Sequence, residues 1–158
     1  MNTASLKEIK KELEITPPDR LLEICLQLTK FKKENKELLS YLLFEEGNEP
    51  QYIENVKEII DTQHQSIHRS NWYFAKKGIR KMVSLANKYI KYSKVKTTEI
   101  ELLIYVCEKI NALNINKRNY PVLNNIYEAQ LKKINKIIET LHEDEQYDYL
   151  KLVDELVE

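Results

Sequence analysis

The stretch from 98 to 113 reads TEIELLIYVCEKINAL and carries apolar side chains on almost every side of a helix. Such a helix has no broad polar face to offer to solvent, so it belongs in the interior of a helical protein. Thr98 and Glu101 have the spacing of a capping box, which predicts that the helix begins at Thr98. The sequence therefore predicts an all-α protein with this helix at its centre.

Amphipathic helical periodicity continues on both sides of this central segment. Only two Gly and four Pro interrupt the chain, and short loops favour antiparallel helical hairpins stacked in sequence order. Either an α–α superhelix or an orthogonal bundle fits this pattern. We expect a single domain over 1–158 with about eight helices, placed near 5–13, 16–31, 35–47, 50–70, 71–93, 98–113, 120–141 and a last acidic segment around 147–156.

Helix ends are predicted from a few local signals. Thr16 and Asn35 each precede an apolar periodic segment and read as N-caps, and Gly47 reads as a helix terminator. Either Ser70 or Asn71 breaks the chain and caps a new helix, or the chain continues through this point as one long helix. The helix before this point has a stripe predicted to be buried: Ile53, Val56, Ile60, Gln63 and Ile67.

The composition of the chain bounds its class. A chain of 158 residues, of which 42% are hydrophobic, is long enough to form a core without disulfides. Cys25 and Cys107 lie on apolar helical faces and are too far apart in sequence for a metal or redox motif. The N-terminus lacks the apolar run of a secretory signal, and no stretch approaches the roughly 18 uncharged residues of a membrane span. We therefore expect a cytoplasmic protein with reduced thiols and no membrane partner.

Charge is segregated along the chain, although the formal net charge is zero. Residues 37–61 carry seven acids and one lysine, and residues 139–158 carry eight acids and one lysine. Between them, residues 62–98 contain no carboxylate. This acid-free stretch holds nine basic residues: Arg69, Lys76, Lys77, Arg80, Lys81, Lys88, Lys91, Lys94 and Lys96.

The helix expected at 71–93 has one apolar face and one cationic face. At about 100° per residue, most of its cations fall within an arc of roughly 140°. Like charges at i and i+4 repel by about 0.2–0.5 kcal/mol per pair, so we expect a counter-charge. Either the acidic C-terminal helix provides it within the chain, or this face binds a partner or an anion. The residues predicted for such binding are Tyr73, Lys76, Lys77, Arg80, Lys81, Lys88 and Lys91.

The spacing of the three histidines bears on whether the protein is an enzyme. His64 and His68 are one helical turn apart, but Gln65 stands where a zinc protease helix needs glutamate. An acid precedes a histidine by three residues at Asp61 and at Glu139, as in di-iron bundles, but the central helix lacks inward-facing glutamates. No nucleophile arrangement or phosphate-binding loop is recognisable. We expect no catalytic residue, no metal and no cofactor.

Three runs of the sequence support a resemblance: LLEICLQLTKFKKENKELLSYLLFE at 21–45, YFAKKGIRK at 73–81 and LHEDEQYDYL at 141–150. In these runs the chain is similar to a family of small uncharacterised bacterial all-helical proteins. The resemblance implies a bacterial origin and a helical fold, and it implies no activity or site residue.

Two functions of different class follow from the charge pattern. The first is a non-catalytic helical scaffold or adaptor that binds another protein. The alternative is nucleic-acid or phosphate binding through the basic face at 71–93, because clustered cations attract phosphates. The neutral net charge is unlike that of most nucleic-acid-binding domains.

Overall fold

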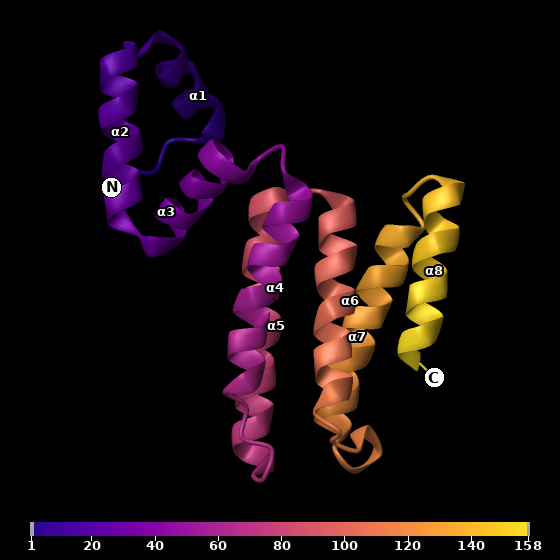
Figure 1. The fold of residues 1–158 in the computed structure, drawn as a ribbon. Coiled ribbons are helices and arrows are strands. Elements are labelled where there is room, and N and C mark those ends of the chain that lie inside the picture. The colour runs from indigo at the N-terminus through magenta and orange to yellow at the C-terminus, as the bar shows by residue number, and fades with distance from the viewer. Residues whose placement is uncertain (1, 158) are drawn as a thin grey trace. The chain divides into compact units, whose positions relative to one another are not determined.

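The computed structural model describes residues 2–157 and is all-helical over that range (Figure 1). The expected all-α fold with about eight helices is confirmed. A π-helical turn at Tyr41–Glu45 and a 3₁₀ turn at Lys117–Asn119 accompany the α-helices. The α-helices are α1 (Leu6–Ile15), α2 (Pro18–Phe31), α3 (Lys33–Ser40), α4 (Glu49–Gln65), α5 (Trp72–Ser93), α6 (Lys96–Ala112), α7 (Pro121–Ile138) and α8 (Glu143–Val157).

The chain contacts divide the protein into two compact units, an N-terminal unit up to residue 44 and a C-terminal unit from residue 45. The N-terminal unit contains α1, α2 and α3, and the C-terminal unit contains α4 to α8. The expectation of one domain over 1–158 stays a prediction. None of the described helices is both long and apolar enough to cross a membrane.

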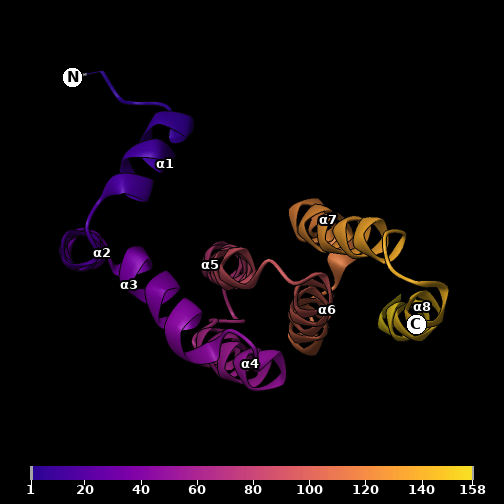
Figure 2. The ribbon, with the colours of Figure 1, turned by 90° about the horizontal axis from the view of Figure 1, so that it is seen from above.

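The C-terminal unit consists of antiparallel helical hairpins stacked in sequence order. Viewed from above, α4, α6 and α8 form one row and α5 and α7 form the other (Figure 2). Each helix packs against the next one in the chain, and α6 also packs against α4 and α8 of its own row. Alternate helices therefore form two layers, as in an α–α superhelix.

Helix α6 lies at the centre of this unit and contacts all four other helices. Its side chains Ile100, Leu102, Leu103 and Val106 are completely buried. Burying each such side chain contributes about 1.5–3 kcal/mol to the free energy of unfolding, so α6 accounts for much of the stability of the core. Burial also raises the pKa of the Cys107 thiol to about 12, which keeps this cysteine protonated at neutral pH. The predicted central position is confirmed.

The predicted capping box at Thr98 and Glu101 is wrong. Helix α6 begins two residues earlier, at Lys96, and Val95 is its N-cap. Thr98 is completely buried within the first turn, and its hydroxyl donates a hydrogen bond to the carboxylate of Glu49 in α4. The side chain of Thr98 thus satisfies a group on a distant helix rather than its own backbone.

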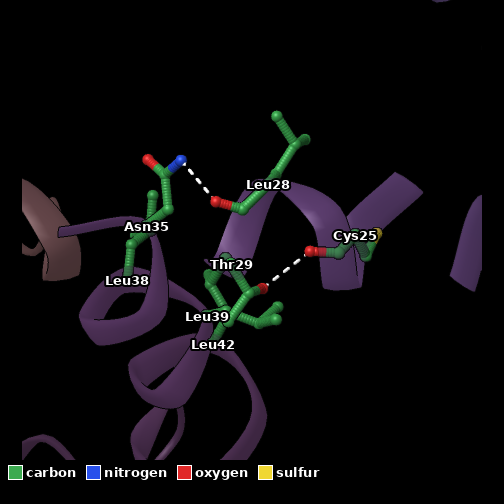
Figure 3. Close-up of a pocket in the computed structure, with 7 residues that line it drawn as sticks. All are labelled: Cys25, Leu28, Thr29, Asn35, Leu38, Leu39 and Leu42. Atoms are coloured by element: carbon green, nitrogen blue, oxygen red, sulfur yellow. Dashed lines mark hydrogen bonds between the residues drawn. The ribbon is translucent and has the colours of Figure 1, made fainter. Parts of the chain in front are cut away.

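Two N-caps predicted in the N-terminal unit are also wrong. The Thr16 hydroxyl donates to the carbonyl of Glu12 at the end of α1, and α2 has Pro17 as its N-cap. Asn35 lies inside α3, where its side-chain amide donates to the carbonyl of Leu28 at 2.8 Å (Figure 3). Both side chains bind free carbonyls near the end of the preceding helix, which need partners as much as free N–H groups do.

The chain breaks between α4 and α5, so one continuous helix through Asn71 is excluded. Asn71 is the N-cap of α5, and its side chain accepts a hydrogen bond from the Tyr73 amide at 2.9 Å. In the connecting loop, Ile67 is 6% exposed and packs on α5 over Gly78. A Cβ atom at Gly78 would lie 2.8 Å from Ile67 Cγ1, so glycine permits this close approach.

The N-terminal unit exposes much of its apolar surface. Leu6, Ile15, Phe31 and Phe44 are each between 76% and 83% exposed. Helices α2 and α3 pack together and leave a shallow hollow between them (Figure 3). The hollow is lined by Cys25, Leu28, Thr29, Asn35, Leu38, Leu39 and Leu42.

Candidate functional site

Helix α5 carries the predicted site and is held by its apolar face. Ala75, Ile79, Met82 and Ala86 are completely buried, and their spacing of three and four residues places them on one side of the helix. The opposite side is therefore directed away from the core. It carries all seven residues predicted from the sequence: Tyr73, Lys76, Lys77, Arg80, Lys81, Lys88 and Lys91.

The predicted cations differ in exposure. Lys77, Arg80, Lys81 and Lys91 are exposed, and Lys76 is partly buried with its ammonium group 5.9 Å from the centre of the Tyr73 ring. Among residues 2–157, no carboxylate forms an ion pair with any of these five groups. Lys88 is partly buried, with its ammonium group 4.6 Å from the Tyr89 ring. The cationic face of α5 is thus open to anions.

Charge pairing between α8 and α5 is not realised in the structure. Helix α8 packs against α6 and α7, and Figure 2 shows it at the opposite end of the unit from α5. Its acids are exposed to solvent: Glu143, Asp144, Glu145, Asp148, Asp154 and Glu155. The acidic helix that the sequence offered as an internal counter-charge therefore leaves the basic face of α5 uncovered.

The fold converts charge segregation along the sequence into segregation between layers. The α5 and α7 layer carries nine basic side chains and a single acid, Glu128. The α4, α6 and α8 layer carries thirteen acids and four lysines. Because hairpin stacking places alternate helices in the same layer, one face of the C-terminal unit is cationic and the other anionic. The electric field of this charge distribution attracts a charged ligand toward the face of opposite sign before contact.

Sequence reasoning confined to α5 misses the cations of α7. Lys133 lies between the two helices, where its ammonium group binds Glu99 at 3.0 Å and the side-chain oxygen of Asn87 at 3.0 Å. Lys136 is exposed one turn further along α7. The signal for these residues is the near absence of acids over 121–138, but only the fold shows that α7 shares a layer with α5.

Two aromatic rings stand beside the cations at the start of α5. Tyr73 is 63% exposed and Phe74 is 53% exposed. Their rings meet edge to face with centroids 5.4 Å apart. In contrast, Trp72 stacks on Tyr120 with centroids 4.2 Å apart, which fastens the start of α5 to the start of α7. The exposed pair offers ring faces to a ligand, and the Trp72 pair is structural.

A second polar cluster joins α4 to α6. The Asp61 carboxylate accepts hydrogen bonds from Tyr105 at 2.8 Å and from Lys109 at 2.6 Å. Burial raises the pKa of Asp61, but these two hydrogen bonds lower it more, so the carboxyl pKa lies below its usual value. The same pair raises the pKa of Lys109. The cluster is a satisfied ion pair that ties two helices together.

His64 lies beside this cluster and has a buried Nε2 atom without a hydrogen-bond partner in the described residues. Burial, then the positive charges of Lys109 and Arg69, lower the pKa of His64. His68 is exposed and lies beyond the end of α4, so the two histidines are not one turn apart on a helix. Within residues 2–157, no three His, Cys, Asp or Glu side chains gather where they could hold a metal.

Comparisons of the chain with protein-family models, with curated proteins and with solved structures gave no match.

Proposed function

We propose that the protein is a non-catalytic helical scaffold of the cytoplasm that binds an acidic region of another protein through the cationic layer formed by α5 and α7. The observation that carries this proposal is the open face of α5, where Lys77, Arg80, Lys81 and Lys91 have no ion-pair partner in the described chain. The cytoplasmic location rests on the free thiols of Cys25 and Cys107. A bacterial origin remains a prediction of the resemblance.

Repulsion between neighbouring cations on this face of α5 favours the binding of an anionic partner. Lys77 and Lys81 are four residues apart on α5, and such pairs repel by about 0.2–0.5 kcal/mol in an isolated helix. An acidic partner removes this repulsion and gains attraction at the same time. Because the groups are exposed, salt screens them over a Debye length of about 10 Å at 0.1 M. Binding is therefore expected to be fast and salt-sensitive.

The test is capture of partners from lysate of the source cells by the purified full chain, at low and at moderate salt. The double variant Arg80→Glu and Lys91→Glu, which reverses two exposed cations of this face, is expected to lose the partners that the unaltered chain retains. A matched variant, Lys7→Glu and Lys11→Glu, makes the same charge change on exposed positions of α1 and is expected to retain them. Recovery of the same proteins with all three chains, or of none with any, would refute the proposal.

Nucleic-acid or phosphate binding is a second candidate, favoured by one specific observation. Tyr73 and Phe74 expose their rings beside Lys77, and stacking of a base on such a ring contributes about 1–3 kcal/mol. The expected result is binding of single-stranded RNA that weakens steeply with salt and is lost on Tyr73→Ala and Phe74→Ala. Fluorescence anisotropy measures both effects. Binding that ignores salt, or that survives loss of both rings, would exclude this candidate.

A further inference from the structure

The cationic layer contains a groove between its two helices. A hollow near the start of α7 is lined by Arg80 and Val83 of α5 and by Val122, Ile126 and Ala129 of α7, among others. One turn further along, a second hollow is lined by Asn87, Ile90, Lys91, Lys94, Glu99 and Lys133. Val83 and Asn87 are neighbours on α5, so the two hollows follow one another between helices that run in the same direction (Figure 1).

The groove has an apolar strip in its first hollow, beside the amides of Asn125 and Gln130, and it has cations at its two ends. Val83 and Ile126 are partly buried, and Val122 is 38% exposed, so their side chains form an apolar strip that is accessible from outside. Arg80 stands at one end of the groove, and Lys91 and Lys94 stand at the other. The single acid in either hollow, Glu99, is already paired with Lys133. The apolar strip and the cations together fit a ligand that is both amphipathic and anionic.

The length of the groove fits a short helix. From Arg80 to Lys94 the chain advances fourteen residues, which corresponds to about 21 Å at about 1.5 Å per residue. A helix of about four turns spans this length and presents an apolar stripe at every third and fourth position. Recognition of an amphipathic helix by an apolar groove is an established mode of peptide binding.

We propose that the groove between α5 and α7 binds an acidic amphipathic helix of the partner protein, with the apolar stripe of that helix on Val83 and Ile126 and its carboxylates on Arg80, Lys91 and Lys94. This proposal rests on the proposed function and assigns its binding site. The apolar strip argues against a phosphate backbone as the occupant, because phosphates gain nothing from contact with valine and isoleucine. Cations at both ends of the groove argue against a neutral or basic helix.

A substitution at Ala129 distinguishes a ligand that is bound in the groove from a ligand that is held only by the charge of the layer. It lines the groove and is exposed, so Ala129→Arg fills the groove without disturbing the core. Arginine is a good helix former, so α7 is expected to remain folded, which circular dichroism checks. The variant blocks the groove by size and also adds a positive charge. A groove ligand must therefore bind more weakly to it, whereas a ligand held by charge alone must bind more tightly.

The probe is a synthetic helical peptide of about four turns, with leucine at every third and fourth position and glutamate on both flanks. We expect it to bind the full chain, and we expect Ala129→Arg to weaken binding at least about tenfold in calorimetry. A peptide of the same composition in scrambled order has the same charge without the apolar stripe and is expected to bind weakly. Lys77→Glu with Lys81→Glu alters the side of α5 away from the groove and is expected to change affinity by less than about threefold.

Several results would overturn the proposal. Binding that is unchanged or tighter in Ala129→Arg and lost in the Lys77 and Lys81 variant leaves the proposed function standing and removes the groove. Equal binding of the ordered and scrambled peptides does the same. Absence of binding to either peptide by the unaltered chain removes the helical occupant. If single-stranded oligothymidylate, or a second copy seen by sedimentation, is the ligand lost in Ala129→Arg, the occupant is a nucleic acid or the chain itself.

Discussion

The variant Gly78→Ala sets two energetic effects in opposition on α5. Alanine is favoured over glycine in a helix interior by about 1 kcal/mol. In this structure, however, the added Cβ atom would lie 2.8 Å from Ile67 Cγ1 and 3.5 Å from Ile67 Cβ. Ile67 is 6% exposed and β-branched at the contact, so it has little freedom to withdraw. Overpacking of this kind costs about 1–3 kcal/mol. We expect Gly78→Ala to lower the free energy of unfolding by about 1 kcal/mol on balance.

A double-mutant cycle isolates the steric effect. Ile67→Ala alone costs about 2–5 kcal/mol because it removes a buried side chain. In that background the clash at Gly78 is gone, so Gly78→Ala is expected to stabilise the protein by about 1 kcal/mol. The coupling between the two sites is then about 2 kcal/mol, well above the roughly 0.5 kcal/mol expected for independent sites. Urea unfolding followed by circular dichroism measures all four chains.

The sign of the Gly78→Ala effect in the unaltered chain tests the contact with Ile67. If Gly78→Ala stabilises the unaltered chain by the same amount as the Ile67→Ala chain, the loop does not pack on α5 through this contact. The exposed helical site Ser84 provides a control, because Ser84→Ala changes helix propensity alone and is expected to stabilise both backgrounds equally.

Three other predictions follow from single side chains. Lys94 caps α5 with a positive φ of 59°, so Lys94→Gly is expected to raise the free energy of unfolding by about 0.5–1 kcal/mol; a loss of stability in urea unfolding contradicts this. The pKa of His64 is lowered on folding, so the unfolded chain binds the proton more tightly and stability is expected to fall as pH drops through about 6.5. His64→Gln should flatten this part of the stability profile, which urea unfolding at several pH values measures. Thr98→Val removes a hydrogen bond to the Glu49 carboxylate and is expected to cost about 1–3 kcal/mol, measured by thermal unfolding; an unchanged melting temperature argues against this contact.

Much of the fold follows from local patterns in the sequence. The stretch from 100 to 107 is apolar on nearly all sides, and α6 is the central helix. The spacing of Ala75, Ile79, Met82 and Ala86 fixes the buried face of α5. Once that face is fixed, the direction of the lysines is fixed as well, because side-chain directions repeat every 3.6 residues. The predicted site residues therefore share one face without any tertiary information.

Helix ends were predictable where the polar side chain bonds to its own helix and were missed where it bonds to another helix. Asn71 caps α5 through its own neighbours, and it is one of the two caps, with Ser70, that the sequence offers at this break. Thr98 looks like a cap but bonds to Glu49, which is 49 positions away in the sequence. Asn35 likewise bonds back to the preceding helix. A side chain that satisfies a distant group has the same local sequence as one that satisfies its own helix, so only the packed structure separates the two.

The helices, the central position of α6 and the existence of a cationic face follow from local patterns, because each depends on the periodicity of a single segment. Tertiary structure decided which charges face each other. It placed α7 beside α5 and α8 beyond α6. The basic face therefore stays open and gains Lys133, and a groove lies between α5 and α7. Stacking of hairpins places every second helix in the same layer. Which helices become neighbours depends on how their buried faces fit together, and the order of residues within a single helix does not fix this.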